Sequence, residues 1–183
     1  MSDAVLLRTE RLLLRPLVAA DVPDVLAYRG SPEVCRYLLH EPRDEAEVRA
    51  RIAETFATAP AHDGDDLQLA VESQGRVIGE VNLHLVSTVH RQAEIGWVFN
   101  PEHQGHGFAT EAATALLETA FTDWGVHRAF AQLDPRNVAS ARLCDRLGMR
   151  REALLREESW FKGQWGDLAI YAILATEWAR RGG

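Results

Sequence analysis

The segment Gln104-Gly105-His106-Gly107-Phe108-Ala109 decides the fold of this chain, because it joins a strand pattern to a helix pattern. Before it stands the apolar stretch Glu94-Ile95-Gly96-Trp97-Val98-Phe99. After it, apolar residues recur at the spacing of an amphipathic helix, at Ala109, Ala112, Ala113, Leu116, Leu117, Ala120, Phe121 and Trp124. Glycines let the backbone approach a ligand closely, and the free N–H groups of a helix N-terminus face a negative charge. The segment predicts a phosphate- or pyrophosphate-binding turn, with an ordinary tight turn as the alternative.

Two common phosphate-binding motifs do not occur in the sequence. The Walker pattern ends in a lysine and a hydroxyl residue, whereas the only lysine of this chain is Lys162. The dinucleotide pattern Gly-x-Gly-x-x-Gly, with an acidic residue about 20 positions later, is not found either. If the glycine turn binds a ligand, that ligand belongs to another class.

Composition narrows the class of protein. The 183 residues suit one domain, and 46% apolar with 26% charged residues are globular values. A net charge of −7 argues against nucleic acid as a partner and fits a cationic small molecule or basic peptide better. No apolar run reaches the roughly 20 residues of a membrane span, and the N-terminus lacks a signal-peptide pattern, so we expect a cytoplasmic protein without membrane contact. Cys35 and Cys144 suggest neither a disulfide framework nor a zinc site, and we expect no metal.

Periodicity and turn residues predict a single α+β domain over residues 1–183. Its sheet is mostly antiparallel, has about seven strands and is flanked by helices. The hairpin signal Gln74-Gly75 joins two of the strands, and Gly148 is a helix C-cap candidate. In chain order the expected elements are strand 11–17, helices 21–28, 32–38 and 44–59, strands 67–73, 76–86 and 93–99, helix 109–124, strand 128–133, helix 138–147 and the hairpin strands 152–161 and 168–176.

Several motifs in this order resemble the GNAT superfamily of acyl-CoA-dependent N-acyltransferases. The pyrophosphate motif of that family, Gln/Arg-x-x-Gly-x-Gly/Ala, is matched by Gln104, Gly107 and Ala109. A second match is Asn137-x-x-Ser140, and the C-terminal hairpin around Trp160–Trp165 is similar to the ribosomal-protein N-terminal acetyltransferase branch. The resemblance implies acetyl-CoA, or a longer acyl-CoA such as succinyl-CoA, as donor. It implies a primary amine as acceptor, either a protein N-terminus or a small molecule.

The resemblance also implies a splay between the fourth and fifth strands, here 93–99 and 128–133. Pantetheine would fill the gap, and a free backbone N–H would stabilise the oxyanion. The implied cofactor residues are Trp97, Val98 and Phe99 along pantetheine, Gln104, Gly105, His106, Gly107, Phe108, Ala109 and Thr110 around the pyrophosphate, and Asn137 and Ser140 near the thiol. Purely structural roles stay open, since Asn137 suits a helix N-cap and Trp97 with Phe99 suits the core.

Three residues are candidates for the general base: Glu94, which stands where relatives often carry a strand glutamate, His84 and Glu80. Glu80, Asn82 and His84 alternate on one strand face, which is either solvated or part of a cleft. An α-amine needs little help from a general base, because its deprotonation at pH 7 costs only roughly 1–1.4 kcal/mol. Deprotonation of a lysine-type amine at the same pH costs about 4.6 kcal/mol.

The general acid departs from the family pattern, because many family members use a helix tyrosine at the position of Cys144. We expect Cys144 to pack as a small apolar residue and Ser140 or water to protonate the thiolate.

The acceptor is the part of the function that the sequence leaves open. In the family it is selected by the segment between the first two helices and by the C-terminal hairpin, here about 30–42 and 160–165. Aromatic residues at the hairpin, Trp160, Phe161 and Trp165, suggest a homodimer or, equally, a cap on the core. Two alternatives to the enzyme are an acyl-CoA-binding sensor with little turnover and a structural domain with an empty turn.

Overall fold

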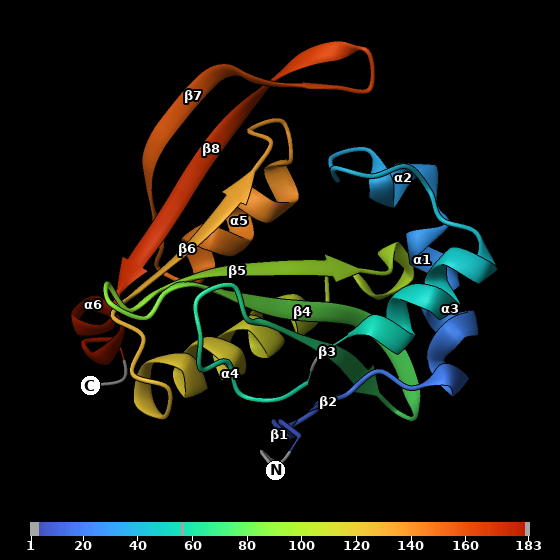
Figure 1. The fold of residues 1–183 in the computed structure, drawn as a ribbon, viewed down its shortest axis with the longest axis horizontal. Helices are drawn as coiled ribbons and strands as arrows, with labels where there is room; N and C mark the ends of the chain where they lie inside the picture. Colours follow the sequence, from blue (N-terminus) through green and yellow to red (C-terminus); the bar gives the residue numbers. More distant parts are fainter. Residues whose placement is uncertain (1–3, 56, 182–183) are drawn as a thin grey trace.

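Eight strands form one sheet in the order β1-β2-β3-β4-β5-β6-β8-β7 (Figure 1). The computed structural model describes residues 4–55 and 57–181. The strands are β1 (Leu7–Arg8), β2 (Leu13–Arg15), β3 (Asp66–Ser73), β4 (Arg76–Ser87), β5 (Gln92–Phe99), β6 (Arg128–Leu133), β7 (Arg150–Phe161) and β8 (Gln164–Leu174). The α-helices are α1 (Val22–Arg29), α2 (Pro32–Cys35), α3 (Glu45–Glu54), α4 (Phe108–Thr122), α5 (Val138–Arg146) and α6 (Ala175–Ala179), with 3-10 turns η1 (Ala19–Asp21) and η2 (Pro101–His103).

Helices cover both faces of the sheet and divide the core in two. On one face the apolar stripe of α4 packs against β3, β4 and β5, where Leu116 and Ile95 are almost fully buried. On the other face α1 and α3 pack Val25, Val48 and Ile52 over Ala70 of β3. Among the described helices none is long and apolar enough to cross a membrane. The predicted α+β domain with a mostly antiparallel sheet is therefore confirmed.

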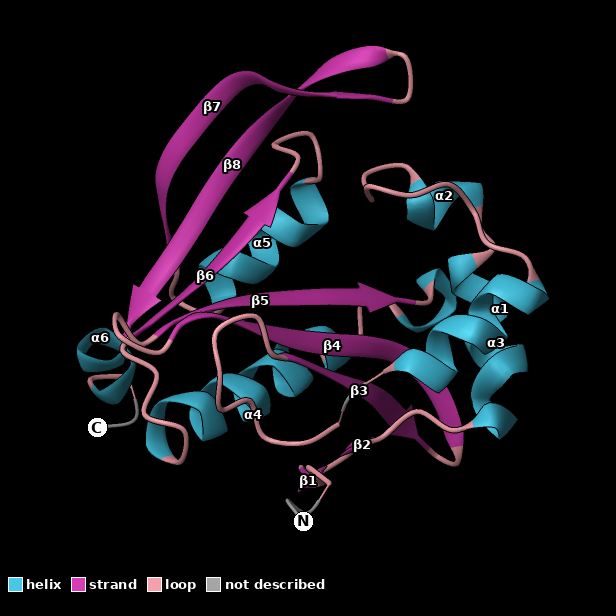
Figure 2. Ribbon diagram, viewed as in Figure 1, coloured by secondary structure: helices cyan, strands magenta, loops and turns pink. Residues whose placement is uncertain are grey.

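The sheet is antiparallel except where β5 meets β6. These two strands pair in parallel through Gln92–Arg128, Ala93–Ala129 and Glu94–Phe130 only. Beyond Glu94 they diverge, and Figure 2 shows β6 rising away from β5 together with the β7–β8 hairpin. The predicted splay between the two strands is confirmed, and it leaves residues 95–99 of β5 without a strand partner on that side among the described residues.

The largest differences from the predicted boundaries concern four elements. The strand expected at 11–17 is only β2 (Leu13–Arg15), because residues 9–12 form a turn closed by hydrogen bonds between Thr9 and Leu12, and the short strand β1 (Leu7–Arg8) before this turn was not predicted. The helix expected at 44–59 ends at Glu54, since the backbone of Thr55 is extended, and Phe56 lies outside the described residues. The segment expected as helix 32–38 is helical only to Cys35, in α2. The last predicted strand stops at Leu174, where the Glu177 side chain accepts the Leu174 N–H and starts α6.

Candidate active site

The glycine turn lies at the end of β5 and opens onto α4. Gly105 and Gly107 both have φ of +81°, a left-handed conformation that strains any other residue. Gly107 is the N-cap of α4 and provides no side-chain cap, so the first N–H groups of a 15-residue helix remain available. Gln104, Gly105, His106 and Gly107 are all exposed. This combination fits a pyrophosphate group, as the sequence predicted.

The Arg11 side chain links the glycine turn to α4. Its guanidinium donates to the carbonyl of His106 at 3.0 Å and forms an ion pair with Glu111 of α4 at 2.6 Å. It also lies 4.7 Å from the centre of the Phe108 ring, which in turn stacks on His106. Burial opposes ionisation of Glu111, but hydrogen bonds from Thr9 and Arg11 hold its pKa below the ordinary value. Sequence reasoning placed Arg11 in a strand and missed this role, because its partners are about a hundred residues away.

Helix α5 contacts β5 through a side-chain hydrogen bond. The indole Nε1 of Trp97 on β5 donates to the Ser140 hydroxyl at 3.2 Å. Asn137 caps α5 by accepting the Ser140 N–H at 3.1 Å, so its N-cap role is confirmed. The structure thus brings Trp97, Asn137 and Ser140 together. Phe99 is buried in the core, which leaves its backbone rather than its ring to contact a ligand.

On the other face of the sheet, a polar row crosses four strands. Asp66, His84 and Glu94 occupy paired positions on β3, β4 and β5. His84 Nδ1 lies 2.8 Å from an Asp66 carboxylate oxygen. Gln132 of β6 donates to Glu94 at 3.1 Å across the start of the splay. Burial raises the pKa of Glu94, and the Gln132 hydrogen bond partly opposes this, so Glu94 has the environment of a general base.

Glu80 has a different environment, although it shares this face. It is 3% exposed and accepts hydrogen bonds from Tyr28 at 2.8 Å, from Arg29 at 3.0 Å and from Gln68. Hydrogen bonds and the charge of Arg29 lower the pKa of Glu80 in spite of burial. Because these donors occupy its oxygens, we assign Glu80 to the support of the fold and leave Glu94 and His84 as base candidates.

Comparisons with known proteins identify the family. A family model described as an acetyltransferase (GNAT) domain matches residues 11–150. The chain belongs to the GNAT family. The uncharacterised N-acetyltransferase YnaD of Bacillus subtilis is 31% identical over 170 residues, which are 93% of this chain and 97% of that protein. The resemblance inferred from the sequence is confirmed.

Two solved acetyltransferase structures have the same fold. A GNAT-family acetyltransferase from Bacillus anthracis has a TM-score of 0.85 at 29% identity, over 94% of this chain and 100% of that chain. Spermidine N-acetyltransferase from Vibrio cholerae, solved in complex with CoA and spermine, has a TM-score of 0.78 at 26% identity, over 93% of this chain and 99% of that chain.

One position departs from the tyrosine that many GNAT enzymes carry. Cys144 on α5 is fully buried, and burial raises its pKa to about 12. The prediction that it packs as a small apolar residue is confirmed. Ser140, one turn earlier, is the hydroxyl that faces the splay through its contact with Trp97.

The two segments expected to select the acceptor meet at the tip of the β7–β8 hairpin. Lys162 Nζ donates to the carbonyl of Cys35 at 2.6 Å and lies 3.9 Å from the Glu41 carboxylate. Figure 1 shows the hairpin tip above α2, with β5 and β6 diverging below. The tip of the hairpin is therefore tied to α2 and to the segment that follows α2.

Proposed function

We propose that this protein transfers the acetyl group of acetyl-CoA to a primary amine. The observation that carries the proposal is the splay of β5 from β6 directly before the glycine turn of α4. The N–H groups from Gln104 to Thr110 would hold the pyrophosphate, and the free backbone of Trp97, Val98 and Phe99 would line pantetheine. The GNAT family and a relative solved with CoA support acetyl-CoA as the donor.

The reaction we propose is direct attack by the neutral amine on the thioester carbonyl. A C–N bond forms, the C–S bond breaks, and the thiolate leaves. Glu94 accepts the amine proton directly or through water, and His84, held by Asp66, extends this proton path. A free N–H of β5 in the splay would stabilise the oxyanion, and the Ser140 hydroxyl is the nearest donor for the thiolate on α5.

Glu94→Gln is expected to lower kcat by about a hundredfold or more, because it removes the proton acceptor while preserving size. In the parent protein kcat/KM should fall as the pH drops through the raised pKa of Glu94. Gln132→Leu removes a hydrogen bond that lowers this pKa, so the acidic limb should move to higher pH. The measurement is release of CoA thiol against pH with a panel of amines and peptide N-termini.

Glu54→Gln, on an exposed position of α3, is the control for the same chemical change. A Glu94→Gln protein with unchanged kcat would contradict the assignment of the base. Acetyl-CoA binding without transfer to any amine would support the alternative that the protein is an acyl-CoA-binding sensor and not an enzyme. Absence of acetyl-CoA binding would overturn the proposed function itself.

We further propose that two copies associate through the edge strand β7. β7 pairs only with β8 among the described strands, and Trp160 on β7 and its partner Trp165 on β8 remain 61% and 56% exposed. Leu154 and Leu155, further along β7, are exposed as well. A long exposed edge with apolar side chains favours pairing with a second edge. Light scattering should give twice the 20.4 kDa chain mass, and Trp160→Ser with Trp165→Ser should give the monomer. Val89→Ser, at another exposed apolar position, is the control, and a monomeric parent protein would contradict this proposal.

The cytoplasm is the compartment that we propose for this activity. Cys35 and Cys144 are both free and buried, which fits a reducing environment.

A further inference from the structure

The glycine turn between β5 and α4 presents a run of unpaired backbone donors. Within residues 4–55 and 57–181, no hydrogen bond joins the N–H of any residue from Gly105 to Thr110 to another protein group. In the proposed function these N–H groups face the pyrophosphate of the donor. The affinity for that group therefore depends on the peptide groups of the turn keeping a single orientation.

The peptide group between His106 and Gly107 is free to turn over on steric grounds. Its plane is rigid and trans, so the carbonyl of His106 and the N–H of Gly107 point in opposite directions. Turning the plane over changes φ of Gly107, which is +81°, and glycine accepts φ of either sign. The inverted peptide would present the carbonyl oxygen of His106 in place of the N–H of Gly107, and this oxygen would repel a phosphate.

Arg11 holds this peptide group by its carbonyl. Nη1 of Arg11 donates to the carbonyl oxygen of His106 at 3.0 Å, and no other donor within the described residues reaches that oxygen. With its carbonyl directed at Arg11, the peptide aims the N–H of Gly107 away from the guanidinium. The arginine therefore selects one of the two orientations that the glycine allows.

The guanidinium is itself fixed by Glu111 on the first turn of α4. Its Nε and Nη2 lie 2.7 and 2.6 Å from one carboxylate oxygen of Glu111. The other oxygen accepts the Thr9 hydroxyl at 2.5 Å and the Arg11 N–H at 3.0 Å. A planar fork held by both oxygens of a carboxylate has little freedom to move away from the turn.

We infer that Arg11 is a positioning residue for the acyl donor, which keeps the Gly107 N–H aimed at the pyrophosphate. This inference rests on the proposed function. Each of the three guanidinium nitrogens contacts a protein oxygen, so Arg11 acts through the turn. The segment between β1 and β2, about a hundred residues before the turn, thus supports the donor site.

Two donors test the inference: acetyl-CoA, and S-acetylpantetheine, which lacks the pyrophosphate and the adenosine. Arg11→Gln should raise Kd and KM for acetyl-CoA by about tenfold or more, since a hydrogen bond from a charged donor has about this effect. It should leave kcat at saturating acetyl-CoA, and kcat/KM for S-acetylpantetheine, unchanged. Calorimetry gives Kd, and release of thiol gives the kinetic constants. Arg49→Gln is the matched control, because Arg49 pairs with Glu45 on the exposed surface of α3.

The double variant Arg11→Gln, Glu111→Gln separates orientation from charge, because Arg11→Gln alone leaves the Glu111 carboxylate uncompensated near the anion. Weak binding of acetyl-CoA that persists in the double variant would support the inference. Recovery of the parent affinity would assign the loss to the charge of Glu111 and overturn it. Parent affinity in Arg11→Gln, or equal losses with both donors, would also overturn it while the proposed function stands. No binding of acetyl-CoA to the parent protein would overturn the proposed function first.

Discussion

Gly107→Trp should weaken acetyl-CoA binding by at least about a hundredfold, or roughly 2.7 kcal/mol. Gly107 has a φ of +81° and is the N-cap of α4, so a side chain there strains the backbone and fills the space before the helix N–H groups. The nearest protein atom to an added Cβ is an Arg11 guanidinium nitrogen at 3.5 Å. The indole would therefore also displace the Arg11 side chain, which donates a hydrogen bond to the turn.

The measurement is a calorimetric titration with acetyl-CoA, with thermal unfolding recorded for each protein. Gly75→Trp is the matched control, because Gly75 has a φ of +77°, open space around it and a place in the β3–β4 turn. It should share the backbone strain and keep the affinity. Equal affinity in the Gly107→Trp protein would refute the pyrophosphate site at this turn.

Glu80→Gln is expected to have the largest effect on stability, about 3–5 kcal/mol. The change leaves the Arg29 guanidinium, whose side chain is 13% exposed, without its anionic partner inside the protein. Glu45→Gln removes an equivalent glutamate from the exposed pair with Arg49, which should cost no more than about 1 kcal/mol. Urea unfolding of the two variants compares the same chemical change in a buried and an exposed ion pair. Similar losses in both would show that Glu80 and Arg29 do not stabilise the fold.

The same pair predicts a pH dependence of unfolding. The fold lowers the pKa of Glu80, so its contribution is complete above the pKa of the unfolded chain and is lost as the pH falls through the lower folded value. Glu80→Gln should therefore flatten the acid side of the stability profile. A profile that keeps the parent slope would assign the acid sensitivity to other carboxylates.

Short local patterns in the sequence predicted most of the fold, but the alternation of polar residues on β4 did not assign each residue its role. The glycine turn, the hairpin at Gln74-Gly75 and the cap at Gly148 are short signals whose chemistry lies within a few residues, and all three occur in the structure. The alternation of Glu80, Asn82 and His84 correctly placed them on one face. It could not separate Glu80, which is buried in an ion pair, from His84, which stays partly exposed.

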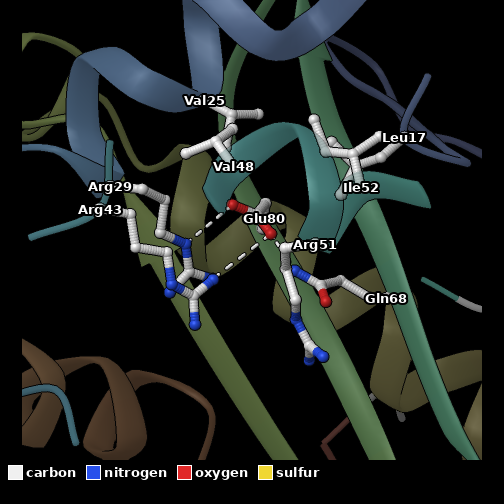
Figure 3. Close-up of a pocket in the computed structure, with 9 residues that line it drawn as sticks. All are labelled: Leu17, Val25, Arg29, Arg43, Val48, Arg51, Ile52, Gln68 and Glu80. Carbon is white, nitrogen blue, oxygen red and sulfur yellow. Dashed lines mark hydrogen bonds and ion pairs between the residues drawn. The ribbon is translucent and has the colours of Figure 1, made fainter. Parts of the chain in front are cut away.

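By itself the sequence determined the order of elements, the glycine turn before α4 and the GNAT family, because these depend on residues adjacent in the chain. Only the tertiary structure decided which polar groups meet. Glu94 meets Gln132 across 38 positions, Arg11 meets Glu111 across 100, and Lys162 meets Cys35 across 127. The three arginines of the small cavity at Glu80 (Figure 3) likewise come from α1, α3 and the residues before α3. Periodicity tells which face a side chain occupies, whereas its partner on that face depends on how the sheet and helices pack.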